Sequence, residues 1–355
     1  MISSFIKIKI KNLKQSIVSQ KKTTKKTILV TGAGGYVGSI LVPMLLKKNF
    51  KVIAVDKFFF GKTLPEHRDL RLLKKDTRNI SAKYFINVYA VIDLVALSND
   101  PSGNNFPELT WQINYQSRLR TAKISKEMGV KKYILPSTCS VYGNQKKIVT
   151  ENSKTKPLSI YAKSNLNAEK DIIKLKSKNF VIIVLRQATL FGYSPRMRFD
   201  LAVNGMTEGV YKNNILPIMR NGLQYRPLCH VKDTSRLMAK LINQNLKKYN
   251  GQIFNVGSKF CTESIINIAK LVLNNVNKSA KLKWYGNPDN RSYKVSFKKL
   301  KKLGFKPRYS INYGVKEMVE YFKNNKIKKN LKSITIEWYR YLESKGKFLK
   351  KYEKK

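Results

Sequence analysis

Short apolar runs alternate with helix-patterned segments along the first half of the chain. The runs lie at residues 27–31, 51–56, 70–74, 89–96, 132–136 and 180–185. Most of the segments between them repeat apolar residues at helical spacing, beginning with a helix predicted over about 36–48. Strands that alternate with helices are typical of a parallel sheet covered by helices on both faces. The pattern therefore predicts an α/β fold with a doubly wound parallel sheet.

A glycine-rich turn follows the first apolar run. Gly32, Gly35 and Gly38 occur at the spacing that permits a tight turn out of the strand, close approach of a pyrophosphate to the backbone, and tight packing of the next helix. Tyr36 and Val37 lie where the helix would begin and offer its free N–H groups to phosphate. An ordinary glycine-rich turn could carry the same glycines, so the flanking strand and helix support the interpretation as a Rossmann dinucleotide site.

Further candidate cofactor residues follow the next predicted strands. Asp56 closes the second strand, 18 residues beyond Gly38, where an acid can bind the adenosine ribose and repel a 2′-phosphate. The expected cofactor is therefore NAD rather than NADP. Asp76 and Thr77 are expected beside the adenine. Val95, Ala96 and Leu97 are expected where the cofactor would pass, and Ser98 is expected near the substrate.

The second half of the chain is less regular. From about residue 190, Gly, Pro and Asn interrupt short apolar groups such as 252–256. We expect a smaller mixed α/β substrate-binding region here, with the chain returning to the main sheet. The predicted divisions are a basic N-terminal extension at 1–26, an NAD-binding domain at 27–189, the substrate-binding region at 190–330 and a basic tail at 331–355. The extension is interpreted as a disordered tail or a misassigned start, with a targeting presequence as the alternative.

The charge of the chain is extreme. Lys and Arg total 71 against 21 acidic residues, giving a formal net charge of +50. Nucleic-acid binding is one interpretation. However, the lysines are spread over the whole chain together with many Asn and Ile residues, which favours a coding bias and a solvated basic surface; no nucleic-acid partner is expected. Such a surface would still attract an anionic substrate.

The cysteines and the hydropathy pattern bear on the compartment. Cys139, Cys229 and Cys261 are far apart and show no metal-ligand spacing, which suits a reducing compartment. No apolar stretch approaches the roughly 18 residues that would span a bilayer. We expect a cytoplasmic protein with no membrane partner and no metal.

The motifs together resemble those of the extended short-chain dehydrogenase/reductases, in the nucleotide-sugar epimerase/dehydratase branch. The resemblance covers about residues 27–325. It rests on the glycine turn, Asp56, Asp76, the sequence Ser137-Thr-Cys-Ser-Val-Tyr-Gly143 and Tyr161-Ala-Lys-Ser in that order. Several motifs in one order are more specific than any one of them.

This resemblance implies catalytic roles for two residues. Thr138 would hydrogen-bond the sugar hydroxyl that is oxidised, and Tyr161 would remove its proton while NAD accepts the hydride. Asn114 would steady the strand ends around the cofactor, and Ser137 would lie against it. The family pattern places Lys four residues after the tyrosine, but this chain has Asn165 there. Asn165 could still bind the nicotinamide ribose, although it cannot lower the pKa of the tyrosine by its charge.

The resemblance also implies substrate contacts. Asn204 matches an asparagine near the diphosphate and sugar, and Arg226 and Arg291 match two arginines that bind the diphosphate and the nucleoside ribose. A guanidinium group suits this task because its planar fork binds phosphate oxygens in pairs. The expected partner is a nucleotide-diphosphate sugar.

The resulting functional hypothesis is a 4-epimerase that oxidises C4 transiently with bound NAD. A dehydratase is disfavoured because Cys139 and Ser140, rather than acids, follow Thr138. A reductase is disfavoured by Asp56, and Asn165 leaves open a weakened binding protein. The resemblance also suggests a homodimer that pairs helices near 107–127 and 159–177.

Overall fold

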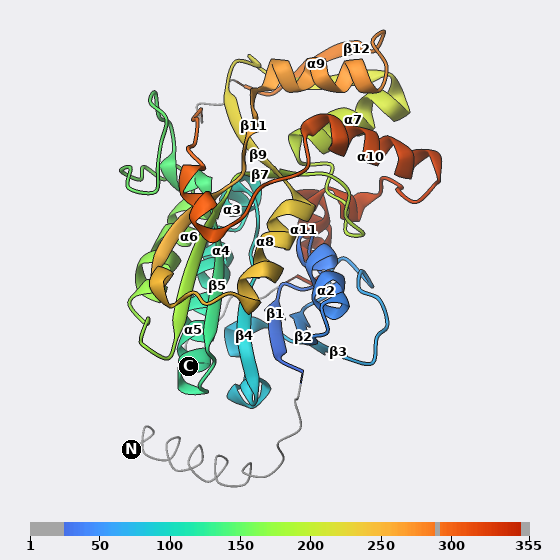
Figure 1. The fold of residues 1–355 in the computed structure, drawn as a ribbon. Coiled ribbons are helices and arrows are strands. Elements are labelled where there is room, and N and C mark those ends of the chain that lie inside the picture. The colour runs from blue at the N-terminus through green and yellow to red at the C-terminus, as the bar shows by residue number, and fades with distance from the viewer. Residues whose placement is uncertain (1–24, 288–291, 349–355) are drawn as a thin grey trace.

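A parallel sheet of seven strands forms the centre of the molecule (Figure 1), in a computed structural model that describes residues 25–287 and 292–348. The strand order is β10-β6-β5-β4-β1-β2-β3, and every neighbouring pair is parallel. Its first six strands follow the 3-2-1-4-5-6 order of dinucleotide-binding folds. The strands are β1 (Thr27–Thr31), β2 (Lys51–Asp56), β3 (Leu70–Lys74), β4 (Val88–Asp93), β5 (Lys132–Thr138), β6 (Val181–Gln187) and β10 (Gln252–Val256). The predicted doubly wound sheet is confirmed.

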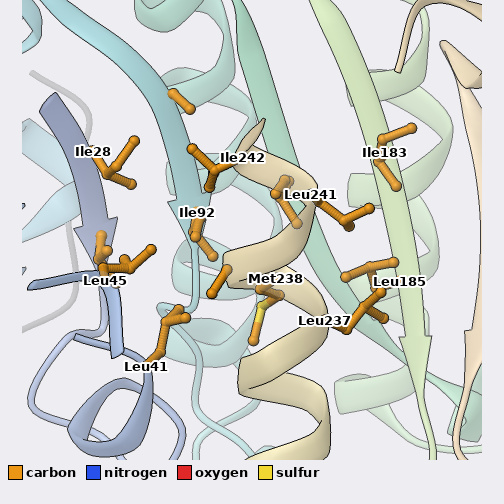
Figure 2. Packing of buried hydrophobic residues seen from close by; sticks show 14 of the residues in the cluster. Ile28, Leu41, Leu45, Ile92, Ile183, Leu185, Leu237, Met238, Leu241 and Ile242 are labelled. Carbon is orange, nitrogen blue, oxygen red and sulfur yellow. The ribbon is translucent and has the colours of Figure 1, made fainter. Parts of the chain in front are cut away.

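Helices cover both faces of this sheet because successive strand residues point to opposite sides. Ile28 lies in the core on the side of α2 (Gly38–Lys47) and α8 (Val231–Asn243), whereas Leu29 lies in the core on the side of α5 (Arg118–Glu127) and α6 (Ile160–Ile173). Figure 2 shows the first face, where Leu237, Met238, Leu241 and Ile242 of α8 pack toward the strands beside Leu41 and Leu45 of α2.

Two smaller sheets and three helices gather at one end of the parallel sheet. Figure 1 shows α7, α9 and α10 there, and their apolar faces share a core with Phe191, Leu216 and Leu228. The elements of this part are β7 (Thr189–Phe191), α7 (Ala202–Asn213), β8 (Ile215–Met219), β9 (Tyr225–His230), β11 (Ser258–Ser264), α9 (Ile265–Asn275), β12 (Lys281–Tyr285) and α10 (Ile311–Lys323). One sheet has the order β11-β9-β7, and β12 pairs with β8.

Short helices connect the larger elements. They are η1 (Thr77–Asn79), η2 (Ala82–Phe85), α3 (Asp100–Asn105), α4 (Pro107–Trp111), the π-helical turn η3 (Gln112–Ser117), η4 (Cys139–Tyr142), η5 (Lys247–Tyr249), η6 (Lys298–Leu303) and η7 (Leu331–Ser333). The last described element is the helix α11 (Thr335–Ser344). The longest described helix, α6, has 14 residues, and no described helix is long and apolar enough to cross a membrane.

Two segments differ from the sequence-based expectations. β4 ends at Asp93 rather than at 96, because the chain turns at Leu94 to pass over Gly32. β10 lies within residues 190–330, where the chain was expected to return to the main sheet, and it pairs with β6 at the edge of that sheet, where Phe254 is fully buried.

The second difference concerns the expected basic tail at 331–355. Its residues Thr335–Ser344 form α11, because Tyr339 and Leu342 lie on one face and are buried. Tyr339 packs in a cluster with Leu97 and Phe106. Residues 1–24 of the expected extension and 349–355 of the tail lie outside the described residues.

Candidate active site

A cavity of about 320 Å³ opens at the carboxyl ends of β1, β2, β4, β5 and β6. This is the edge at which doubly wound sheets bind their ligands. Most residues that the sequence singled out line its wall, and they are Gly32, Gly35, Tyr36, Val37, Gly38, Asp56, Asp76, Thr77, Val95, Ala96, Leu97, Ser98, Ser137, Thr138, Tyr161 and Asn165. Asn114, Asn204 and Arg226 do not line it, and Arg291 lies outside the described residues.

The glycine turn has little room for side chains. Gly32 has a φ of +61°, and a Cβ there would lie 2.7 Å from the carbonyl carbon of Leu94. A Cβ at Gly38 would lie 2.3 Å from the carbonyl oxygen of Ala33. At Gly35 the only neighbour of a Cβ would be the carbonyl oxygen of Gly32, so this side faces the cavity. The turn therefore brings free amides at the start of α2 to the cavity.

Asp56 fixes the end of β2 against this turn. Its carboxylate accepts hydrogen bonds from the amides of Gly34 at 2.9 Å and Phe58 at 2.6 Å. Burial raises the pKa of Asp56, and these amides and the charge of Arg196 partly offset that rise. A carboxylate thus lies in the cavity wall beside the glycine turn.

Asp76 and Thr77 form the wall after β3. Asp76 caps η1 by accepting from the amide of Arg78 and pairs with its guanidinium at 2.7 Å. Burial raises the pKa of Asp76, but the bonds and charge of Arg78 outweigh this effect and lower it overall. The Thr77 hydroxyl lies 3.1 Å from that of Ser117, which anchors this wall to η3.

The loop after β4 is held by Asn114 from behind. The Asn114 side chain accepts from the amide of Leu97 at 2.8 Å and donates to its carbonyl at 3.1 Å. The amide of Val95 donates to the Thr31 hydroxyl at 3.2 Å. Asn114 is therefore a positioning residue that shapes the wall rather than part of it.

Thr138 and Tyr161 meet across the cavity. Thr138 is the last residue of β5, and Tyr161 lies in the first turn of α6, which Ser159 caps through the amide of Ala162. Burial raises the pKa of Tyr161, and Asp100 adds to that rise. A hydrogen bond with Thr138 and the charges of Arg198 and Arg118 act in the opposite direction. A hydroxyl and a phenol thus share one end of the cavity.

Asn165 is buried one turn after Tyr161. Its amide nitrogen donates to the carbonyl of Tyr161 at 2.8 Å, and its oxygen accepts from Nη1 of Arg118 at 2.8 Å. Lys163 is exposed on another face of α6. Sequence reasoning missed Arg118, although an arginine four residues after Asn114 could have indicated a second polar residue on the same helical face.

A buried ion pair supports the end of β5. Arg186 of β6 donates to Glu169 of α6 at 2.7 Å, and the Ser137 hydroxyl donates to the same carboxylate. The hydrogen bond to Glu169 therefore fixes the side chain of Ser137, the residue before Thr138.

Two arginines of the loop before α7 also line the cavity and were missed. Arg198 pairs with Asp200 and donates to the Ser98 hydroxyl at 3.2 Å. The guanidinium of Arg196 lies 3.6 Å from the centroid of the Phe60 ring, and its Nε and Nη1 have no hydrogen-bond partner among the described residues. Burial and the charge of Arg198 lower the pKa of Arg196 to about 10.

The other predicted substrate residues lie outside the cavity wall. Asn204 accepts from the amide of Gly192 at 2.9 Å and donates to the Tyr36 hydroxyl at 3.1 Å, so its contacts are structural. Arg226 is half-buried on β9, where it donates a hydrogen bond to the Tyr225 carbonyl. Its positive charge acts to lower the pKa of Tyr293, which lines the cavity.

Comparisons with known proteins agree with this geometry. A model described as the NAD dependent epimerase/dehydratase family matches residues 28–257. A Bacillus subtilis protein named as an uncharacterized UDP-glucose epimerase, YtcB, is 28% identical over 314 residues, covering 83% of this chain and 97% of its own length. The UDP-glucuronate 4-epimerase of Thermodesulfobacterium geofontis is 27% identical over 319 residues, covering 84% of this chain and 96% of its own length.

Solved structures share the fold. The UDP-glucuronic acid 4-epimerase from Bacillus cereus, in complex with UDP-glucuronic acid and NAD, superimposes with a TM-score of 0.76 at 24% identity. The match covers 84% of this chain and 99% of that one. The residues matched by the family model include the whole cavity wall except Tyr293 and Tyr339.

Proposed function

Because this chain belongs to the NAD dependent epimerase/dehydratase family, we propose that it is an NAD-dependent nucleotide-sugar 4-epimerase. The observation that carries the proposal is the placement of Thr138 and Tyr161 in one cavity with the glycine turn and Asp56. Relatives named as UDP-glucose and UDP-glucuronate epimerases make UDP-sugars the first substrates to test.

The residues around the cavity fit NAD. The turn at Gly32 and Gly38 tolerates no Cβ and presents amides to a pyrophosphate, and Asp56 would bind the adenosine ribose and repel a 2′-phosphate. Asp76 and Thr77 would border the adenine. When bound, NAD would take a hydride from C4 of the sugar and return it to the other face of the resulting keto sugar.

The chain's own residues would handle the proton. Thr138 would hydrogen-bond the C4 hydroxyl, and Tyr161 would remove its proton and return it in the reverse step. An unperturbed phenol has a pKa of about 10, so roughly one in a thousand would be ionised at neutral pH. Burial raises the pKa of Tyr161 and so reduces the ionised fraction further, whereas the charges of Arg198 and Arg118 act to lower this pKa.

Several arginines would bind the diphosphate of the substrate. Arg226 and Arg291 are the residues implied by the resemblance. Arg196 is a further candidate, since two of its nitrogens have no hydrogen-bond partner among the described residues and it lines the cavity. A guanidinium can bind two phosphate oxygens at once.

A product assay tests the proposal. The protein with NAD would be incubated with UDP-, GDP-, CDP- and dTDP-sugars, and the C4 epimer would be detected by proton NMR. Tyr161→Phe is the matched control, because it keeps the ring and removes only the hydroxyl. It should lower turnover about 10²- to 10⁴-fold with NAD binding unchanged. A wild-type protein that binds NAD but forms no product from any of these sugars would refute the proposal.

Two alternatives within the family are less well supported. A dehydratase would need an acid near Thr138, but burial raises the pKa of the Cys139 thiol, which hydrogen-bonds the Arg186 carbonyl at 3.3 Å. A reductase that uses NADPH is disfavoured by Asp56. A binding protein with little turnover is favoured only by Asn165, and the same product assay separates it from an enzyme.

The quaternary structure is also a proposal. α5 and α6 lie side by side on one face of the parallel sheet. Paired with their copies, they would form a homodimer, and light scattering on the purified protein would give its mass.

A further inference from the structure

Arg118 is a buried cation that the proposed reaction has not yet used. It follows the π-helical turn η3 and is the first residue of α5, and its side chain is 1% exposed. The guanidinium forms part of the cavity wall with Pro136 and Asn165. π-Helical turns often occur at functional sites.

Both Nη atoms of this guanidinium donate hydrogen bonds, whereas Nε has no hydrogen-bond partner among the described residues. Nη1 donates to the Asn165 oxygen at 2.8 Å, and Nη2 donates to the carbonyls of Asp93 and Pro136 at the ends of β4 and β5. Nε lies 3.6 Å from the carboxylate of Asp93. That carboxylate also accepts hydrogen bonds from Thr31 and Tyr133, so its charge is shared among three side chains. The Nη1 edge therefore presents positive charge to α6.

Asn165 connects Arg118 to Tyr161. Its oxygen accepts from Arg118, and its amide donates to the main-chain carbonyl of Tyr161. A lysine at 165 would place a second cation against the guanidinium in a site that is 2% exposed. Asparagine is neutral and can do what lysine cannot, since it accepts a hydrogen bond from the arginine.

We infer that Arg118, held in place by Asn165, supplies the fixed positive charge beside Tyr161 that a lysine at position 165 would otherwise supply. This inference rests on the proposed function, because it assigns Arg118 as a positioning residue for the proton transfer at Tyr161. It also gives a reason for the departure from the Tyr-x-x-x-Lys pattern: the cation comes from α5 rather than from α6.

Other charged and polar groups that face Tyr161 also affect its pKa. Asp100, from α3, disfavours the phenolate, whereas Thr138 of β5 and Arg198 of the loop before α7 favour it. Arg198 is paired with Asp200, as Arg118 is with Asp93, and its charge favours the phenolate more than that of Arg118 does. Lys163 is exposed on another face of α6. Arg118 differs from Arg198 in its hydrogen bond to Asn165, which links it to the turn of α6 that carries Tyr161.

The decisive measurement is the titration of the Tyr161 phenol itself. Protein with NAD and tyrosines labelled with ¹³C at Cζ would be titrated by NMR, with the Tyr161 resonance assigned by its loss in Tyr161→Phe. We expect Arg118→Met to raise the pKa of Tyr161 by at least one unit and Arg118→Met/Asn165→Lys to bring it back toward the wild-type value. An unchanged pKa in folded Arg118→Met would overturn the inference.

A second variant covers the chance that Arg118→Met unfolds, since it leaves Asp93 without its buried partner. Asp93→Asn/Arg118→Met removes both charges of the pair. It should raise the pKa of Tyr161 by less than Arg118→Met does, because the negative charge of Asp93 is removed together with the positive one. The inference fails if this folded variant titrates like wild type. Asn165→Lys alone should lower the melting temperature, because it places two cations together, and Arg118→Met in the same chain should restore it.

The inference and the proposed function can fail separately. The NMR titration needs no substrate, so a shifted pKa with no turnover of any sugar nucleotide would refute only the epimerase. If the wild type is active, its rate should rise with pH to a plateau as Tyr161 ionises. Arg118→Met should move the midpoint of that rise upward, and about tenfold less activity at neutral pH would accompany each unit. An active variant with an unmoved midpoint would refute the role of Arg118 alone.

Discussion

Replacing Glu169 by glutamine should lower the free energy of unfolding by about 3–5 kcal/mol. The substitution keeps the size and shape of the side chain and removes its charge. Glu169 is 1% exposed and its partner Arg186 is 4% exposed, so neither group can turn to water. Arg186 contacts the carboxylate at 3.1, 3.1 and 2.7 Å, and after the change its charge would remain buried without a counter-charge.

The magnitude follows from that unpaired charge. Removing one partner of a buried ion pair costs several kcal/mol, whereas replacing both partners with apolar residues is often close to neutral. Glu169→Leu/Arg186→Met should therefore regain most of the stability that Glu169→Gln loses. The Ser137 hydroxyl would also lose its charged acceptor next to Thr138, so turnover should fall together with stability.

Urea unfolding followed by circular dichroism would measure the effect in protein without added ligand. Glu66→Gln is the matched control, because Glu66 pairs with Lys62 on the surface, where an ion pair contributes little. Its midpoint should equal that of the wild type. A loss below about 1 kcal/mol for Glu169→Gln, or a double variant no more stable than the single one, would refute the reasoning.

Three further predictions concern the cofactor. Asp56→Asn should reduce the preference for NAD over NADP at least tenfold in binding titrations, because only the charged carboxylate repels a 2′-phosphate and binds the ribose strongly. For the same reason the NAD affinity of the wild type should fall as the pH drops through the raised pKa of Asp56. An unchanged preference in Asp56→Asn would count against the assignment. Gly32→Ala should abolish NAD binding because its Cβ would clash with Leu94. Gly129→Ala should bind NAD normally, because a Cβ there would have no atom of the described residues within 4 Å. Tyr339→Ala should weaken NAD binding measurably while Tyr341→Ala, on the exposed face of α11, should not; equal effects would show that Tyr339 does not contact the ligand.

The sequence predicted the sheet well because its central strands β1, β4, β5 and β6 are buried on both faces, whereas the edge strand β3 has no buried residue. β2 and β3 begin and end where the apolar runs do, since polar or charged residues flank them. β4 was overestimated because Leu94 and Val95 are apolar yet belong to the cavity wall. An apolar run cannot distinguish a buried strand from a buried loop.

The part of the candidate site that could be predicted consists of residues in short motifs at the ends of strands. Gly32 directly follows β1, and Asp56 and Thr138 are the last residues of β2 and β5, so the parallel sheet brings them to one edge. Arg118 and Tyr339 come from helices far apart in the sequence, and Tyr339 lies in a segment whose lysines suggested a tail. The positions of Arg118 and Tyr339 in the cavity wall depend on tertiary packing, which cannot be predicted from a short sequence motif.

The position of β10 has a consequence for how this chain can fold. β6 is buried almost along its whole length, and one of its edges is covered only by residues 252–256. A fragment that ends at 189 would expose that edge as an unpaired apolar strand, which is a template for aggregation. During synthesis the parallel sheet stays incomplete until more than 60 further residues have left the ribosome, about 3–12 seconds at typical rates. Residues 27–189 are therefore not expected to form an autonomous module, and their solubility should depend on a strand contributed late in translation.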